Sequence, residues 1–309
     1  MTERANLKAR LMTELNPNCL IPAILRQDEP LARRTTLRVG GNADVYVEPA
    51  DETQLATILR ACLRLNAPFV LLGRGSNLLV RDGGIPGLVI CLAQPHFSKV
   101  EILGHRLHCG AGAKLKQVSV DAKRQQLTGL EFLEGIPGTV GGALRMNAGA
   151  MGGWMFDVVE SIRYMDHAGD IHEEEAAKVK VEYRSCPLLK TNIALGAVLK
   201  GHPAARDVVD KRMKAFSEKR WESQPAAPSA GCIFKNPGTV PAGKLIDELG
   251  LKGTRVGDAM VSHEHGNFII NDGQATAKDV LALIEVIREK ARSARGIELE
   301  TEVEIIGEQ

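Results

Sequence analysis

Glycines crowd into one part of this chain. Sixteen of the 31 glycines lie between Gly73 and Gly153, a stretch that contains only about a quarter of the 309 residues. Glycine lets the backbone adopt positive φ and lets another group approach the main chain closely, but it weakens strands and helices. We therefore predict short strands joined by loops here. These glycines serve either as tight connections or as bare backbone for a bound molecule.

Composition excludes several classes of partner. The chain has 39 Lys and Arg against 38 Asp and Glu, a net charge of +1, so no strong field favours nucleic acid or an anionic membrane. With 7 Phe, 3 Tyr and 2 Trp, aromatic platforms for single-stranded nucleic acid are not expected. No stretch approaches the ~18 apolar residues of a membrane span, and the charged N-terminus lacks a signal sequence. We expect a cytoplasmic protein that binds neither nucleic acid nor membrane.

The cysteines indicate a reducing compartment. None forms a CxxC pair or shows zinc-site spacing with histidine, so no metal site is expected. The six are Cys19, Cys62, Cys91, Cys109, Cys186 and Cys232.

Strand and helix signals alternate along the first two thirds of the chain. Alternation at residues 43–47 predicts a strand, and Asp51 with an apolar face from Leu55 to Leu63 predicts a capped helix. Residues 68–92 predict strand, loop, strand, turn and strand, and 113–128 a second helix. Strands with polar turns continue to about Lys200. The pattern indicates an α+β fold.

The last third begins with a change of composition at 201–207, which predicts a domain boundary. A charged helix follows, then a Pro/Ser/Gly-rich linker from Glu222. Thr276 predicts the N-cap of a helix that ends at Gly296. Residues 297–305 alternate strictly, which predicts a strand with four glutamates on one face.

Two phosphate-binding motifs are nearly present and both fail. The segment from Gly73 to Leu78 begins like a dinucleotide fingerprint, but its sixth position is Leu and a strand, not a helix, is predicted next. The segment from Gly238 to Lys244 has P-loop spacing, but Leu245 replaces the hydroxyl residue that would ligate magnesium. The glycines therefore suit a different anion-binding use, in which backbone N–H groups face a pyrophosphate.

Seven segments together carry a family resemblance. They are TTLRVGG, LLGRGSNLLVRDGGIPGLVI, EGIPGTVGGALRMNAGAMGG, YRSC, SAGCIFKNP, AGKLIDELGLKG and EVEIIG, and they run in this order from about Thr35 to Gly307. The chain resembles the UDP-N-acetylenolpyruvoylglucosamine reductases, which make UDP-N-acetylmuramate for peptidoglycan.

The resemblance implies a split, two-part FAD domain of the vanillyl-alcohol-oxidase (PCMH) type and a C-terminal α+β substrate-binding domain. The implied division is an N-terminal extension at 1–30, FAD subdomains at 31–95 and 96–200, and a substrate domain at 201–309. The cofactors are FAD and NADPH. The cofactor-binding residues would be Gly73, Arg74, Gly75, Ser76, Asn77, Gly135, Ile136, Pro137, Gly138, Gly141, Gly142, Asn147, Ala148 and Gly149.

The resemblance also assigns three catalytic residues. Hydride addition to the vinyl carbon leaves charge beside the substrate carboxylate, so the site needs a charge stabiliser and a proton donor. Arg184 matches the family arginine, and Cys232 lies where the family usually has Ser as donor. Glu302 matches the family glutamate, with Glu300 and Glu304 as alternatives on the same acidic face.

Arg220, Lys235, Asn236 and Lys244 are the residues expected to bind the substrate diphosphate. Between Ala205 and Pro237 there is no room for the Tyr-bearing loop of one subclass, so the chain resembles the shorter subclass. Cys186 replaces a common Ser beside Arg184.

The expected partners are the UDP-amino-sugar enolpyruvyl ether and NADPH, and the expected state is a monomer. The alternatives are another flavin oxidase on this scaffold, a nonenzymatic nucleotide-binding protein and a P-loop NTPase.

Overall fold

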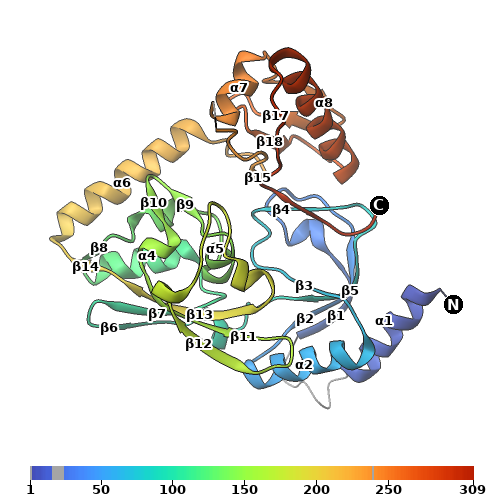
Figure 1. Cartoon of the computed structure of the whole chain (residues 1–309), viewed down its shortest axis with the longest axis vertical. Coiled ribbons are helices and arrows are strands. Elements are labelled where there is room, and N and C mark those ends of the chain that lie inside the picture. The colour runs from blue at the N-terminus through green and yellow to red at the C-terminus, as the bar shows by residue number, and fades with distance from the viewer. Residues whose placement is uncertain (1, 16–23, 239) are drawn as a thin grey trace. The chain divides into compact units, whose positions relative to one another are not determined.

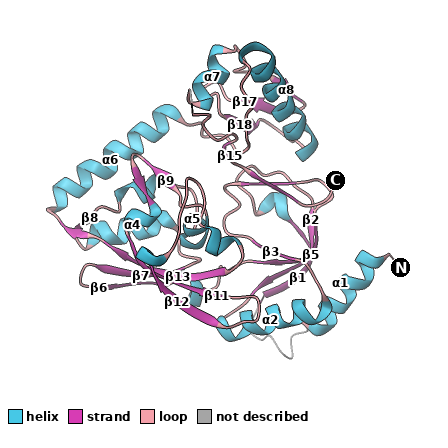
Figure 2. Ribbon diagram, viewed as in Figure 1, coloured by secondary structure: helices cyan, strands magenta, loops and turns pink. Residues whose placement is uncertain are grey.

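The computed structural model describes residues 2–15, 24–238 and 240–309 (Figure 1). Helices and strands are mixed along the chain, which confirms the predicted α+β class (Figure 2). The helices are α1 Glu3–Glu14, α2 Glu52–Leu65, α3 Pro95–Ser98, α4 Leu115–Arg124, α5 Val140–Arg145, α6 Arg206–Ser223, α7 Ala242–Glu248 and α8 Ala277–Arg295. None of the described helices is both long and apolar enough to cross a bilayer.

The strands are mostly short, as the glycine-rich sequence predicts. They are β1 Ile24–Pro30, β2 Asn42–Glu48, β3 Phe69–Leu71, β4 Leu78–Val80, β5 Ile85–Ile90, β6 Val100–Leu103, β7 Arg106–Gly110, β8 Leu127–Thr128, β9 Gly149–Ala150, β10 Gly153–Trp154, β11 Val159–Met165, β12 Ile171–Glu175, β13 Ile193–Lys200, β14 His202–Pro203, β15 Ser229–Cys232, β16 Arg255–Val256, β17 Ala259–Val261, β18 Phe268–Asn271 and β19 Glu304–Ile306.

Internal contacts divide the chain into two compact units. Unit 1 is Met1–Gln27, Val45–Gly73 and Gly87–Glu218, and unit 2 is Asp28–Asp44, Arg74–Pro86 and Lys219–Gln309. Each unit buries its own cluster of apolar side chains. The four-part division drawn from the sequence stays a prediction.

The chain forms a sheet of order β1-β2-β5-β3, and unit 1 contains an antiparallel sheet of order β12-β11-β13-β7-β6. The predicted helix after Asp51 is α2, and the Asp51 carboxylate accepts the Gln54 N–H at 2.9 Å. Leu55 and Ile58 on its apolar face are buried as predicted, whereas Leu63 is 68% exposed. The apolar face of α2 is therefore narrower than the sequence pattern indicated.

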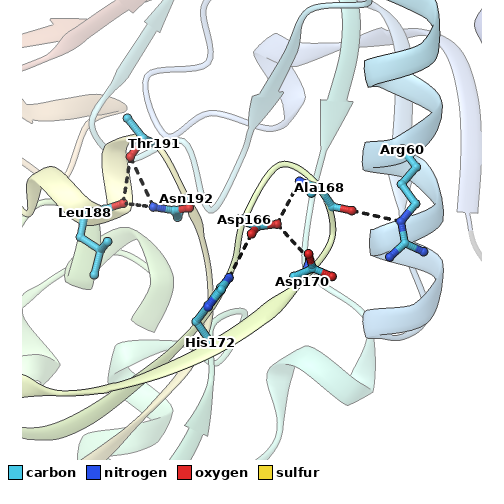
Figure 3. A network of polar contacts seen from close by, with 8 residues as sticks. All are labelled: Arg60, Asp166, Ala168, Asp170, His172, Leu188, Thr191 and Asn192. Atoms are coloured by element: carbon cyan, nitrogen blue, oxygen red, sulfur yellow. Dashed lines mark hydrogen bonds and ion pairs between the residues drawn. The ribbon is translucent and has the colours of Figure 1, made fainter.

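The turn between β11 and β12 is anchored to α2 (Figure 3). The Asp166 carboxylate accepts N–H groups of Ala168 and Asp170, both at 2.9 Å, and lies 3.0 Å from Nε2 of His172. Arg60 of α2 donates from Nε to the Ala168 carbonyl at 3.0 Å. His172, with the two backbone donors, lowers the pKa of the Asp166 carboxyl. In the same unit, Asn192 donates from Nδ2 to the Leu188 carbonyl at 2.9 Å.

Unit 2 contains an antiparallel sheet of order β15-β18-β17-β16, with α7 and α8 in the same C-terminal region (Figure 1). Thr276 and Asp279 form the predicted capping box of α8, which ends at Gly296 with φ 66°. The Asp82 carboxylate also accepts the N–H groups of Ala277 and Lys278, at 2.8 and 2.9 Å. β4 pairs in parallel with β19. These contacts bind the 74–86 segment to the C-terminal part of unit 2.

Two sequence-based expectations differ from the structure. The predicted linker from Glu222 contains strand β15, because Ser229–Cys232 pairs with β18. The predicted strand over 297–305 is regular only at Glu304–Ile306. The buried positions Leu299 and Val303 still alternate with more exposed ones. The sequence pattern therefore predicted the buried positions correctly but predicted too long a strand.

Candidate active site

The second glycine run enters helix α5, which is capped by Thr139. Gly141 and Gly142 are adjacent but differ in surroundings. A Cβ at Gly141 would lie 3.0 Å from the Cβ of Ala111, and the Gly141 N–H donates to the Ala111 carbonyl at 2.8 Å. A Cβ at Gly142 would meet only the Thr139 hydroxyl, at 3.7 Å. Packing against Ala111 therefore explains why Gly141 lacks a side chain, whereas none of the described residues requires Gly142 to lack one.

The two glycine runs meet within unit 1. A Cβ at Gly73 would lie 3.0 Å from Oγ1 of Thr139, the cap of α5. A Cβ at Gly135 would have no neighbour within 4 Å, and Gly135 does not have positive φ. Gly73 and Gly142 are exposed, whereas Gly135 is buried. Of the three, only Gly142 combines an exposed backbone with room for a Cβ.

The rest of the first run lies in unit 2 and is held by backbone contacts. Gly75 has φ 60°, and a Cβ there would lie 2.8 Å from the Arg34 carbonyl oxygen. The Gly75 carbonyl accepts the N–H and the hydroxyl of Thr36, both at 3.3 Å. The sharp turn that glycine permits is therefore fixed by the TTLRVGG segment that precedes it.

Arg184 sits in a tight turn of unit 1. Glu182 and Ser185 exchange backbone hydrogen bonds of 2.8 and 3.2 Å, and Arg184 has φ 56°, a conformation that non-glycine residues adopt at a cost. Asn147, itself at φ 38°, is buried beside the turn. Its Nδ2 donates to the Glu182 carbonyl and its Oδ1 accepts the Phe156 N–H, both at 3.3 Å. Asn147, predicted to bind cofactor, thus also holds the turn that carries Arg184.

Two aromatic rings bracket the Arg184 guanidinium. Its Cζ lies 5.3 Å from the ring centroid of Trp154 and 5.3 Å from that of Tyr183. The two rings meet edge to face at 5.7 Å, and Nη1 donates to the Gly149 carbonyl at 3.4 Å. A guanidinium over aromatic faces is attracted by their negative potential and loses freedom of orientation. The guanidinium group of Arg184 is therefore held in one orientation.

Cys186, which replaces a common Ser beside Arg184, is buried. Its N–H donates to the Arg145 carbonyl at 2.9 Å, and burial raises the pKa of its thiol. A small apolar thiol fills this position.

Cys232 ends strand β15 in unit 2 at an irregularity. Ser229 pairs with Ile270 and Cys232 with Phe268, so β15 has one more residue than β18 between the pairs. Gly231, at φ 77°, supplies the extra residue. Bulges with glycine in the left-handed region re-aim the next side chain, and Cys232 remains partly exposed.

Glu302 lies on the segment that runs beside Cys232. Its N–H donates to the carbonyl of Ile233 at 2.8 Å, and its carbonyl accepts Nδ2 of Asn77 at 3.2 Å. The side chains of Glu298 and Glu300 are 75% and 73% exposed, whereas Glu302 and Glu304 are partly buried. Burial separates Glu302 from the two exposed glutamates, a distinction that alternation alone did not provide.

The four residues expected to bind the diphosphate have local partners. Lys235 pairs with Glu300 at 2.5 Å, and Lys244 lies 3.8 Å from Glu248 one turn along α7. Asn236 Oδ1 accepts the Ala242 N–H at 3.0 Å, so it caps α7. Arg220 lies 5.3 Å from the Trp221 ring, and its buried Nε has no hydrogen-bond partner among the described residues. Their substrate contacts stay predictions.

Sequence reasoning missed two residues of this framework. Trp154 was not singled out, because nothing in the sequence places a ring at position 154 over the guanidinium of Arg184. Asn267 was also missed. It is buried and bonds both polar backbone atoms of Phe234, two residues after Cys232. The available signal was a polar residue between apolar neighbours in GNFII.

The exposed glycine backbone of unit 1 fits a flavin nucleotide. Gly73 and Gly142 are exposed, and a Cβ at Gly142 would have room in the described structure. Such open backbone accepts a pyrophosphate and a flat ring. Among the described residues no group of three His, Cys, Asp or Glu side chains could hold a metal ion.

Two family models match the chain. A family model described as an FAD binding domain matches residues 43–174, and one described as the C-terminal domain of UDP-N-acetylenolpyruvoylglucosamine reductase matches residues 224–306. The chain is 44% identical over 305 residues to the UDP-N-acetylenolpyruvoylglucosamine reductase of Geobacter metallireducens, covering 98% of this chain and 99% of that protein. It is 42% identical to the same-named protein of Clostridioides difficile, covering 94% and 96%.

A solved structure gives the same result. The crystal structure of UDP-N-acetylenolpyruvylglucosamine reductase from Thermus caldophilus matches with a TM-score of 0.81 at 41% identity, over 91% of this chain and 99% of that chain. The predicted fold, cofactors and family are thereby confirmed. The chain belongs to the UDP-N-acetylenolpyruvoylglucosamine reductase family of flavin-dependent oxidoreductases, which use FAD and NADPH.

Proposed function

We propose that Arg184, Cys232 and Glu302 divide the catalytic work of this reductase. The chain reduces the enolpyruvyl ether of UDP-N-acetylglucosamine enolpyruvate to UDP-N-acetylmuramate. When bound, FAD accepts a hydride from NADPH and passes it to the substrate. The observation that carries the proposal is the backbone pairing that places Glu302 beside the Cys232–Ile233 segment.

Arg184 stabilises the charge that the reaction creates. Hydride addition at the terminal vinyl carbon leaves negative charge on the carbon next to the carboxylate, and the carboxylate shares it. The guanidinium is permanently charged and can bond both carboxylate oxygens. Because Trp154 and Tyr183 already orient it, little reorganisation is needed as the charge develops.

Cys232 supplies the proton. Its Sγ–H bond breaks as a C–H bond forms on the charged carbon, which completes the reduction, and solvent then reprotonates the thiolate. A thiol has an ordinary pKa of about 8.5, so it is a better acid than the hydroxyl of Ser but still carries its proton near pH 7. The irregularity at Gly231 directly precedes Cys232, which is partly exposed, and this supports its role as donor to a bound substrate.

Glu302 stabilises the intermediate from the neighbouring segment. In its protonated form, a partly buried glutamic acid can donate a hydrogen bond to the enolate that precedes protonation. The Asn77 side chain holds the Glu302 carbonyl, which ties this residue to the first glycine run.

The fourteen cofactor residues and the four diphosphate residues keep the roles drawn from the resemblance. Gly142 supports the first group because it is exposed and a Cβ there would have room. Arg220 supports the second because its buried Nε has no hydrogen-bond partner among the described residues.

We also place the enzyme in the cytoplasm as a monomer that supplies peptidoglycan precursors, and through them cell-wall growth, cell shape and division. UDP-sugars and NADPH are both cytoplasmic metabolites. Light scattering of the FAD-loaded protein at several concentrations checks the monomer. A mass of twice 33.4 kDa would contradict it.

The assignment is tested by separating the two half-reactions without oxygen. The bound flavin is reduced with NADPH, substrate is added, and the return of the oxidised flavin absorbance is followed. Cys232→Ala should accept hydride from NADPH normally and then stall, whereas Cys232→Ser should retain substantial turnover. Equal loss in both half-reactions of Cys232→Ala would contradict the proton-donor role. Rapid reoxidation by oxygen with a simple alcohol as reductant would favour the alternative, a sugar oxidase.

A further inference from the structure

The segment that carries Cys232 is held from both sides by backbone contacts in unit 2. On one side, Glu302 donates to the Ile233 carbonyl at 2.8 Å, and Lys235 donates to the Glu300 carbonyl at 2.8 Å. On the other side the partner is Asn267, just before β18. The position of the thiol therefore depends on both flanks.

Asn267 holds this second side of the Cys232 segment with its side chain as well as with its main chain. Its Oδ1 accepts the Phe234 N–H at 2.9 Å, and its Nδ2 donates to the Phe234 carbonyl at 2.8 Å. The Asn267 carbonyl accepts the Ile233 N–H at 2.9 Å. The amide thus replaces the two ladder bonds that a neighbouring strand would form. With 3% exposure it has no water to compete for these bonds.

Asn267 is itself fixed by His265. The Asn267 N–H donates to Nδ1 of His265 at 3.1 Å, and the His265 ring packs edge to face on Phe268 at 4.8 Å. Burial, with a smaller effect of Lys252, lowers the pKa of His265, so the ring is neutral and its Nδ1 can accept. The chain of contacts runs from His265 through Asn267 to the Cys232 segment.

We propose that Asn267 is a positioning residue for proton donation, acting through the backbone that carries Cys232. This rests on the proposed donor role of Cys232. Misplacing a reacting group by about 1 Å can cost on the order of 10²-fold in rate, and two buried hydrogen bonds define the placement here.

The test compares Asn267→Asp with Asn271→Asp. Asn271 is a matched control, because it is also buried and its amide also bonds only backbone, donating to the Leu37 carbonyl at 3.2 Å and accepting the Ala275 N–H at 3.0 Å. Asn267→Asp keeps the volume but turns the donor to Phe234 into an acceptor. We expect it to slow flavin reoxidation by substrate about tenfold or more while flavin reduction by NADPH stays within about twofold. The control should change both by less than about twofold.

Three further readouts separate positioning from mere stability. The pH dependence of Cys232 alkylation by iodoacetamide, read by mass spectrometry of its peptide, should shift in Asn267→Asp and not in Asn271→Asp. Asn267→Ala should show the same kinetic pattern if the Asp variant binds no FAD. In a Cys232→Ala background, Asn267→Asp should cause no additional loss of reoxidation rate.

The outcomes distinguish the two claims. Undiminished reoxidation in Cys232→Ala would remove the donor assignment, whatever Asn267 does. Equal kinetic and alkylation behaviour of the Asn267 and Asn271 variants would overturn the positioning role alone, as would a full additional loss in the double variant.

Discussion

The two units hold the groups proposed to be catalytic in different ways. In unit 1, Arg184 is fixed mainly by side-chain groups, the rings of Trp154 and Tyr183, on a turn with positive φ. In unit 2, the main chain that carries Cys232 and Glu302 is fixed by backbone hydrogen bonds and by the side-chain amides of Asn267 and Asn77. A permanent charge acts over several ångströms, so contacts with two aromatic rings place it accurately enough. Proton transfer, in contrast, needs the donor at hydrogen-bond distance from the acceptor. The proposed proton donor therefore lies on main chain that hydrogen bonds hold directly.

The largest effect should come from Arg184→Ala. Removing the charge that faces the developing carbanion should slow flavin reoxidation by substrate by about 10²-fold or more, as for the loss of other preorganised stabilisers. Flavin reduction by NADPH should persist, and Arg184→Lys should recover only part of the loss because it lacks the planar fork. Rapid-mixing absorbance at the flavin band measures both steps. Arg163→Ala, which removes an exposed partner of Glu52, is the control. Full activity in Arg184→Lys would show that charge alone suffices.

Gly142→Ala should separate cofactor binding from folding. Alanine in helix α5 favours the helix by about 0.5–1 kcal/mol, so the melting temperature of the FAD-free protein should rise. Crowding of the bound cofactor should nevertheless weaken FAD by about 1–3 kcal/mol, roughly 5- to 150-fold in Kd. Titration by flavin fluorescence measures this. Gly141→Ala should do the reverse, lowering the melting temperature, because its Cβ would crowd Ala111. Unchanged FAD affinity in Gly142→Ala would mean that the cofactor lies elsewhere.

Trp154→Leu tests the aromatic bracket. Loss of a cation–π contact worth about 0.5–2 kcal/mol should slow substrate-dependent reoxidation by roughly 2- to 30-fold. Trp154→Phe keeps a ring and should lie between wild type and Leu. Tyr164→Leu, which removes a ring stacked on His172 in the same unit, is the control. An equal effect of Trp154→Leu on the NADPH step would indicate general damage to unit 1 and not a role in orienting Arg184.

The same contrast explains how far sequence reasoning reached. Asp51, Thr276 and Gly296 were readable because caps are local chemistry within a few residues. The alternation over 297–303 reported burial correctly but predicted too long a strand, since only Glu304–Ile306 pairs with β4. Pairing with residues more than 220 positions away leaves no local signal.

The residues proposed to be catalytic were predicted from motifs, and the residues that hold them in place were not. Asn77 was predicted to bind cofactor, yet its side chain reaches the Glu302 carbonyl 225 residues away. Trp154 and Asn267 act through contacts that only the folded chain creates. The periodicity of apolar residues predicts which side chains are buried, and motifs predict which groups react. Neither shows which buried side-chain amide holds a strand in place.

The smallest effect should come from Asp166→Asn, at a turn where one carboxylate organises backbone (Figure 3). The pKa of Asp166 is lowered on folding by His172 and backbone donors, so its charge stabilises the fold above its unfolded pKa of about 3.9. That stabilisation is lost as pH falls through the lower, folded pKa. Asp166→Asn should therefore lower the melting temperature slightly at pH 7 and match wild type once Asp166 is protonated. Asp170→Asn, whose backbone and not its carboxylate bonds Asp166, is the control. A difference that grows toward acid pH would contradict this, since the charge of Asp166 would then be destabilising.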